Sequence, residues 1–177
     1  MARLPYLDEP SDIAKPTYED TARKAGRVLN PIRMIGHSPE LLRDWWTMMM
    51  TLNTKLELNH HLRELILLRL FKITGFEYGF IEHVRISKRL DVPEQQISDI
   101  EEFETSDAFN ECERLMLRYT EHVTRDQPVD DTLFNALREH FSDREMVEIT
   151  FCIGNWNCVS KFALALQLDL EEPRETD

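Results

Sequence analysis

Glu64 and His83 are the two residues of this chain whose types and surroundings favour chemistry. Glu64 lies on a largely apolar face of a predicted helix, because Leu67 and Phe71 follow it by three and seven positions. A carboxylate on such a face must be paired or hydrogen-bonded, or burial must raise its pKa. The position therefore indicates a carboxylate that needs a specific partner.

His83 lies on the apolar face of the next predicted helix, which it shares with Phe76 and Phe80. An imidazole exchanges protons near neutral pH, and a nearby carboxylate can orient it, so the two residues would form an acid–base pair. Taken separately, each residue has a simpler structural explanation. His83 fits a packed core histidine, and Glu64 fits a solvated charge near the start of a helix.

The elements that must position this pair are helices. Apolar residues recur at spacings of three and four, and the chain contains only five glycines. A helix is predicted over residues 59–74, ended by Gly75, and a second one over residues 76–90, ended before Pro93. Because the connection is so short, the two helices are expected to form a tight helical hairpin.

The rest of the chain also predicts helices, so the fold class is all-α. An N-terminal arm is expected at residues 1–16, a single helical domain at 17–170 and a frayed tail at 171–177. Ser38 and Pro39 fit the N-cap and first position of one helix. The remaining helices are predicted at about 18–29, 93–103, 109–124, 131–140 and 142–168, the last with a possible break near Gly154.

The composition is that of an ordinary globular protein, with 177 residues, 42% hydrophobic and 31% charged. A net charge of −12 disfavours nucleic acid and anionic membrane surfaces as partners. No apolar stretch reaches the length of a membrane span or a signal peptide, so we expect a cytoplasmic protein.

The three cysteines, Cys112, Cys152 and Cys158, form no Cys-x-x-Cys motif. Cys152 and Cys158 lie six positions apart in a predicted helix and point to different faces, so they cannot bridge within it. We expect all three to be reduced and to behave mostly as small buried apolar residues.

Other residues are weaker candidates. His60 and His61 precede Glu64, but their spacings match no standard ligand motif, so no metal site is expected. The run of Trp45, Trp46 and Met48–Met50 could line a pocket, although core or subunit interface is the favoured interpretation.

Three aromatic residues near the hairpin or near Gly154 are candidate substrate contacts. Tyr78 begins the helix that carries His83, and its hydroxyl would either reach a ligand or cap a polar edge. Phe80 shares the face of His83. For Trp156, a position in a pocket wall and a position in the core are about equally favoured interpretations.

The segments LRELILLR at 62–69, EYGFIEHVR at 77–85 and LDVP at 90–93 resemble the carboxymuconolactone decarboxylase and alkylhydroperoxidase D-like superfamily. The resemblance extends from about His37 to Leu168. It implies an alkylhydroperoxidase D-like helical domain that acts on a small molecule and assembles into a homo-oligomer, a trimer or a hexamer.

The peroxidase branch of that superfamily carries Cys-x-x-Cys-x-x-x-His on the second helix. When its histidine is placed on His83, its cysteines fall on Phe76 and Gly79, so neither redox residue is present. Glu64 matches the family's proton-relay position. The resemblance thus implies that the proton-handling residues are retained and the dithiol is missing, which disfavours thiol peroxidase activity.

The decarboxylase branch also lacks those cysteines. It implies a decarboxylase or related proton-transfer lyase, without cofactor or metal, acting on a small carboxylated ring compound. His83 would deliver the proton, and Glu64 would set its tautomer or relay protons to it. Two alternatives remain open: an alkylhydroperoxidase-type antioxidant activity, and a non-catalytic homo-oligomer that binds a small ligand.

Overall fold

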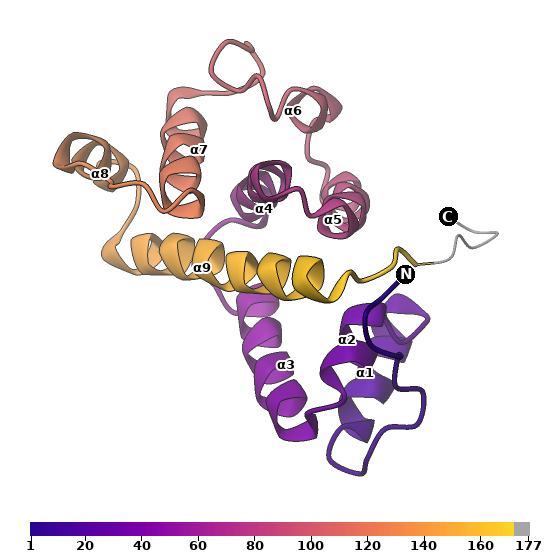
Figure 1. Cartoon of the computed structure of the whole chain (residues 1–177). Coiled ribbons are helices and arrows are strands. Elements are labelled where there is room, and N and C mark those ends of the chain that lie inside the picture. The colour runs from indigo at the N-terminus through magenta and orange to yellow at the C-terminus, as the bar shows by residue number, and fades with distance from the viewer. Residues whose placement is uncertain (172–177) are drawn as a thin grey trace. The chain divides into compact units, whose positions relative to one another are not determined.

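The computed structural model describes residues 1–171, and within that range it consists of helices and connecting loops without a strand (Figure 1). The all-α prediction is confirmed. No described helix combines the length and apolarity that a membrane-spanning segment needs. The helices are α1 (Lys15–Ala25), α2 (Asn30–Ile35), α3 (Pro39–Thr54), α4 (His60–Thr74), α5 (Glu77–Arg89), α6 (Glu94–Ser98), α7 (Glu111–Thr124), α8 (Asp131–Arg138) and α9 (Asp143–Leu166).

The chain divides into two compact units. The first contains residues 1–55 together with the chain from Ala163 onwards, and the second runs from Leu56 to Phe162. Helices α1 to α3 belong to the first unit, and α4 to α8 with most of α9 belong to the second. The candidate residues Glu64 and His83 both lie in the second unit.

The hairpin of α4 and α5 forms because its ends carry the right residues. The Asn59 side chain caps α4 by accepting a hydrogen bond of 2.8 Å from the backbone N–H of His61. Gly75 ends α4 with φ at 71°, a left-handed conformation that glycine adopts without a steric penalty. The predicted tight hairpin is therefore present.

Helix α4 is the central helix of the second unit. It packs against α5 and α7, and a run of its side chains has almost no solvent exposure. A helix that is apolar on nearly every side is typical of a buried core element. Its fully buried apolar residues are Leu65, Ile66, Leu67, Leu68, Leu70 and Phe71.

The segment that leads into α4 is hydrogen-bonded to α9. The carboxylate of Glu148 accepts hydrogen bonds of 2.9 Å from the backbone N–H groups of both Glu57 and Leu58. Arg144, one turn earlier on α9, donates to the same carboxylate at 2.9 Å. These bonds fix the start of α4, and thereby Glu64, relative to the middle of α9 within this unit.

Two predicted helix boundaries near prolines need correction. Proline is compatible with the first turn of a helix, because the backbone N–H groups of that turn have no hydrogen-bond acceptor within the helix. Helix α1 begins at Lys15, so Pro16 lies inside the helix rather than in the predicted arm of residues 1–16. The helix predicted at about 18–29 ends at Ala25, and Pro31 lies in the first turn of an additional helix, α2.

Two further boundaries differ in the second half. Helix α6 ends at Ser98 rather than near 103, and the following turns bury Ile100 and Phe103 without helical structure. Helix α9 continues through Gly154 without the break considered above. A single glycine costs a helix only about 1 kcal/mol, which a long helix tolerates. Of the predicted tail at 171–177, only Glu171 lies within the described residues.

Candidate active site

Glu64 and His83 meet inside the α4–α5 hairpin. The Nδ1 atom of His83 lies 2.7 Å from the Oε2 atom of Glu64, and their exposed fractions are 6% and 0%. An ionised carboxylate only accepts hydrogen bonds, so this contact places a proton on Nδ1. The other ring nitrogen, Nε2, makes no hydrogen bond to any of residues 1–171 and is the atom available for proton transfer.

Arg63 completes the arrangement. Its guanidinium donates to the Oε1 atom of Glu64, from Nη2 at 2.9 Å and from Nε at 3.2 Å, and its side chain is also buried. Each oxygen of the Glu64 carboxylate therefore has its own cationic or polar partner. This contact is not predictable from spacing, because adjacent residues on a helix are not expected to face each other.

This environment fixes the charge of Glu64. Burial raises the pKa of a carboxyl group, but the charge and hydrogen bond of His83 and then those of Arg63 outweigh this effect. The pKa of Glu64 is consequently held below its ordinary value. Glu64 is thus an ionised acceptor at neutral pH and a suitable partner for a histidine that takes up a proton.

Aromatic rings enclose the imidazole. The ring of Trp156, on α9, approaches the His83 ring edge-on, with centroids 4.8 Å apart and an angle of 82° between the planes. The Phe71 ring, on α4, lies 5.3 Å from the imidazole and 5.5 Å from the Trp156 ring. Such walls limit water around His83, which strengthens its interaction with Glu64.

We compared the chain with known proteins. No family model matches it. The uncharacterised protein YnjA of Escherichia coli K12 is 27% identical over 168 residues, which cover 93% of this chain and 92% of that protein. The uncharacterised protein YdfG of Bacillus subtilis 168 is 24% identical over 111 residues, or 62% of this chain and 76% of YdfG.

Solved structures give a closer match. A protein of unknown function from Agrobacterium tumefaciens, described as a candidate antioxidant defence protein AhpD, is 28% identical with a TM-score of 0.74 and covers 79% of this chain and 97% of its own. An AhpD-core, peroxidase-related protein from Ralstonia eutropha JMP134 has a TM-score of 0.84 at 20% identity, over 97% of this chain and 93% of its own. The chain has the alkylhydroperoxidase D-like fold.

A third similar structure is a cysteine-to-alanine variant of the debrominase Bmp8 in complex with 2,3,4-tribromopyrrole. It shares 21% identity with a TM-score of 0.83 and covers 97% of this chain and 93% of its own. At that identity the likeness concerns the fold. The alkylhydroperoxidase D-like fold thus occurs among proteins whose names refer to different chemistries.

Phe76 and Gly79, the positions that the resemblance aligned with the dithiol, lie in direct contact. The Phe76 ring lies over Gly79, so that a Cβ atom at position 79 would be 2.5 Å from Cδ1 of Phe76 and 3.0 Å from Cε1 of Phe71. The first distance is shorter than Cβ contacts in real structures, and the second is tight enough that the Phe71 ring would have to shift slightly. The volume of a cysteine side chain at position 79 is therefore occupied by the ring at position 76.

The cysteines that the alkylhydroperoxidase D-like chain does contain are unpaired and do not form a dithiol site. Cys152 is buried, and this burial raises the pKa of its thiol to about 12 even though Arg63 lowers it. Burial also raises the pKa of the half-buried Cys112 thiol. Cys158 is exposed on α9. A thiolate beside the Glu64–His83 pair is thus disfavoured.

The three predicted substrate contacts lie in different surroundings. Trp156 is in direct contact with His83, as described above. Tyr78 is buried and stacks on Phe76, with centroids 5.9 Å apart. Phe80 is instead covered by Lys72, whose Nζ atom lies 4.5 Å from the ring centroid. The structure therefore groups Trp156 with the pair and places Phe80 against a different partner.

The two histidines before Glu64 lie apart from the pair. The His61 ring forms a hydrogen bond of 2.6 Å with Oε1 of Gln96, while His60 is exposed. Within residues 1–171, no group of three or more histidine, cysteine or acidic residues is arranged to hold a metal ion.

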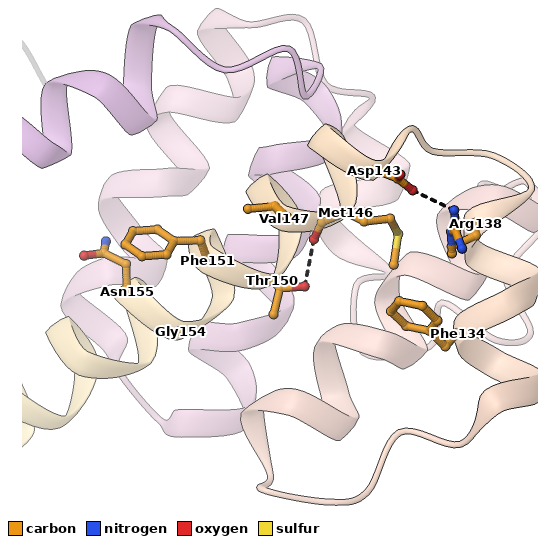
Figure 2. Close-up of a pocket in the computed structure, with 9 residues that line it drawn as sticks. All are labelled: Phe134, Arg138, Asp143, Met146, Val147, Thr150, Phe151, Gly154 and Asn155. Atoms are coloured by element: carbon orange, nitrogen blue, oxygen red, sulfur yellow. Dashed lines mark hydrogen bonds and ion pairs between the residues drawn. The ribbon is translucent and has the colours of Figure 1, made fainter.

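A surface hollow of about 630 Å³ in the second unit lies on α8 and α9 and does not include Glu64 or His83 (Figure 2). Phe134 on α8 and Val147 and Phe151 on α9 contribute to its lining, and an Arg138–Asp143 ion pair of 2.7 Å lies at one end. Its lining is mainly apolar and is separate from the Glu64–His83 pair.

Proposed function

We propose that this alkylhydroperoxidase D-like protein is a cofactor-free, proton-transfer lyase, in the simplest case a decarboxylase of a small carboxylated ring compound. The observation that carries the proposal is the buried chain of contacts from Arg63 through Glu64 to His83. It provides a proton-handling unit on the same helical hairpin as Phe76 and Gly79, the positions where the resemblance would place the dithiol. The alternative chemistry, peroxide reduction, lacks its two sulfurs there.

In the proposed reaction His83 is the catalytic residue. As the carboxylate leaves as carbon dioxide, its bonding electrons remain on the adjacent carbon and spread into the ring carbonyl as an enolate. The imidazolium then donates the Nε2 proton to that carbon, which leaves a neutral imidazole still bonded through Nδ1–H to Glu64. Solvent returns a proton to Nε2 before the next turnover.

Glu64 and Arg63 are positioning residues in this scheme. The Glu64 carboxylate holds the imidazole in one tautomer and one orientation and stabilises its charged form. Arg63 adds to the effect of His83 in holding the pKa of Glu64 below its ordinary value and keeping the carboxylate ionised. Neither residue needs to touch the substrate.

The aromatic walls support a ring compound as the substrate. Phe71 and Trp156 present ring edges and faces around the imidazole, and flat ligands pack well against such surfaces. The Bmp8 debrominase, which has the same fold, is seen with tribromopyrrole, another small ring. A ring-shaped substrate at His83 is consistent with both observations.

The test is a screen of carboxylated lactones and aromatic acids for release of carbon dioxide, run in deuterium oxide. We expect one deuterium to appear at the carbon that loses its carboxylate. His83→Gln should abolish turnover, and Glu64→Gln should lower kcat more than it raises KM. The matched control is Glu82→Gln, which changes a surface carboxylate paired with Arg85 next to His83 and should leave both constants unchanged.

A second set of assays separates the alternatives. A variant with Cys112, Cys152 and Cys158 all changed to serine should retain full lyase activity. Peroxide reduction that disappears in this variant would support the antioxidant function and overturn our proposal. No turnover on the whole panel, combined with a ligand that raises the melting temperature, would favour a non-catalytic binding protein.

A further inference from the structure

Asn157, on α9, carries a buried acceptor that has no donor. Its side chain is 8% exposed, and its Oδ1 atom makes no hydrogen bond with any described residue. The Nδ2 atom donates to the backbone oxygen of Ile153 at 3.0 Å. Turning the amide round would place its oxygen against that carbonyl, so the orientation is fixed and Oδ1 stays unpaired. Buried acceptors without a partner are rare, which points to a donor from outside the chain.

A surface hollow of about 590 Å³ borders this asparagine. Small-molecule sites typically measure about 300 to 1,000 Å³. Its lining comes from the end of α7, the turn that follows and the second half of α9, and it includes Val123, Asp126, Asn157, Cys158, Lys161 and Phe162. All of these residues belong to the second unit. The unpaired acceptor thus lies at a space that is large enough for a small molecule.

Asp126 and Lys161 are the charged residues of this lining. Both are exposed, and neither side chain forms an ion pair or a hydrogen bond with another of the described residues. Arg125, the neighbour of Asp126, is instead paired with Glu121 at 3.9 Å. The hollow therefore presents one anion and one cation, and each has room for a partner.

We propose that this hollow binds a free amino acid with a large apolar side chain. The ammonium group of the ligand donates to Oδ1 of Asn157 and faces the Asp126 carboxylate. The carboxylate of the ligand pairs with the Lys161 ammonium. Its apolar side chain packs against Val123 and Phe162, which removes apolar surface from water.

A ligand that carries both charges matches this lining better than the simpler alternatives. An anion alone would pair with Lys161, but it would meet the negative charge of Asp126 and bring no strong donor to Asn157. A cation alone would leave Lys161 facing a like charge. A neutral apolar ligand would cover these groups without pairing them, and such desolvation is unfavourable. The site is separate from the Glu64–His83 pair, so it does not depend on the lyase activity.

Isothermal titration calorimetry with L-phenylalanine tests the proposal. We expect one saturable site with a Kd of about 1 mM or tighter, which a ligand of this size reaches readily. Two probes each lack one charge: 3-phenylpropionate has no amino group, and phenethylamine has no carboxylate. Each should bind at least tenfold more weakly. No saturable binding of L-phenylalanine up to about 10 mM, or equal affinities for the three probes, would overturn the proposal.

Charge variants show which side chain binds which group. Lys161→Gln should weaken L-phenylalanine at least tenfold and leave the affinity for phenethylamine unchanged. Asp126→Asn should weaken L-phenylalanine to a similar degree, and it preserves the turn because asparagine also tolerates the φ of 55° found there. The controls Lys88→Gln and Asp107→Asn change the same charges at exposed positions outside the lining and should keep the wild-type Kd. Wild-type affinity in both site variants would contradict binding in this hollow.

Cys158 reports occupancy directly, because its exposed side chain is part of the lining. Saturating L-phenylalanine should slow the alkylation of Cys158 by iodoacetamide at least tenfold, as followed by peptide mass spectrometry. The half-buried Cys112, which lies outside the lining, is the internal control and should react at an unchanged rate. Binding without protection of Cys158 would place the ligand elsewhere and refute the site.

Discussion

His83 donates through Nδ1 to the Oε2 atom of Glu64 at 2.7 Å, and this bond joins the two helices of the α4–α5 hairpin. Because Arg63 binds the other oxygen of the same carboxylate, the three side chains form one buried unit. Its charges balance while His83 is neutral, and it gains one positive charge when the imidazole takes up a proton. A substitution of any one of the three residues, or a change in its charge, therefore alters the electrostatic environment of the other two.

Glu64→Gln should destabilise the fold by about 3 to 5 kcal/mol, since it removes the carboxylate charge from a buried ion pair with Arg63. Urea unfolding measures the effect. The control is Glu82→Gln, which removes a carboxylate from a solvent-exposed pair and should cost about 1 kcal/mol or less. Equal costs for the two variants would mean that the buried pair contributes no more than a surface one.

The contribution of Glu64 should be lost in acid. Burial raises the pKa of Glu64, but His83 and Arg63 together hold it below its ordinary value of 4.5, so the folded protein binds this proton more weakly than the unfolded chain does. The stability it supplies is present above about pH 4.5 and disappears as the pH falls through the folded pKa. Urea midpoints from pH 3 to 7 should show the gap between wild type and Glu64→Gln narrowing at the acidic end, and a widening gap would reverse the sign of the shift.

Gly79→Ala should destabilise the protein although alanine is the better helix former. The added Cβ meets Cδ1 of Phe76 at 2.5 Å, and such overpacking typically costs about 1 to 3 kcal/mol. In a Phe76→Ala background the obstruction is gone, so the same change should cost less or even stabilise. A double-mutant cycle from urea unfolding gives the coupling, and strictly additive effects would show that ring and glycine are independent.

The Cys152 thiol should react very slowly with alkylating reagents in the folded protein. With burial raising the pKa of its thiol to about 12, the thiolate fraction at pH 8 is roughly one in ten thousand. In a variant with Cys112 and Cys158 changed to serine, iodoacetamide should label Cys152 at least 1000-fold more slowly in the native state than in urea. Comparable rates in both states would reveal a thiol that reagents reach without unfolding.

The helix boundaries of the hairpin and the positions of Glu64 and His83 can be predicted from local sequence patterns. Asn59 and Gly75 mark the ends of α4 through their preferences for cap positions, and the apolar periodicity places Glu64 and His83 on facing sides of the hairpin. The contact between these two residues can therefore be predicted from the sequence. The functional role of the pair remains a prediction.

Other features depend on the tertiary structure. Arg63 reaches Glu64 although neighbours in sequence point in different directions on a helix, so spacing rules miss it. Phe80 shares a helix face with His83 but lies under Lys72, a contact that its own helix does not determine. Pro31 is a third example. A proline is compatible both with the end of one helix and with the first turn of the next, so its presence alone does not predict helix α2.

The contact between Phe76 and Gly79 also restricts the evolutionary routes open to this chain. A cysteine arising first at position 79 would collide with the ring, and one arising first at position 76 would leave a cavity in a packed region. Only the two changes together restore room for a dithiol. The packing of Phe76 on Gly79 therefore hinders the introduction of a thiol pair at these two positions at each single step.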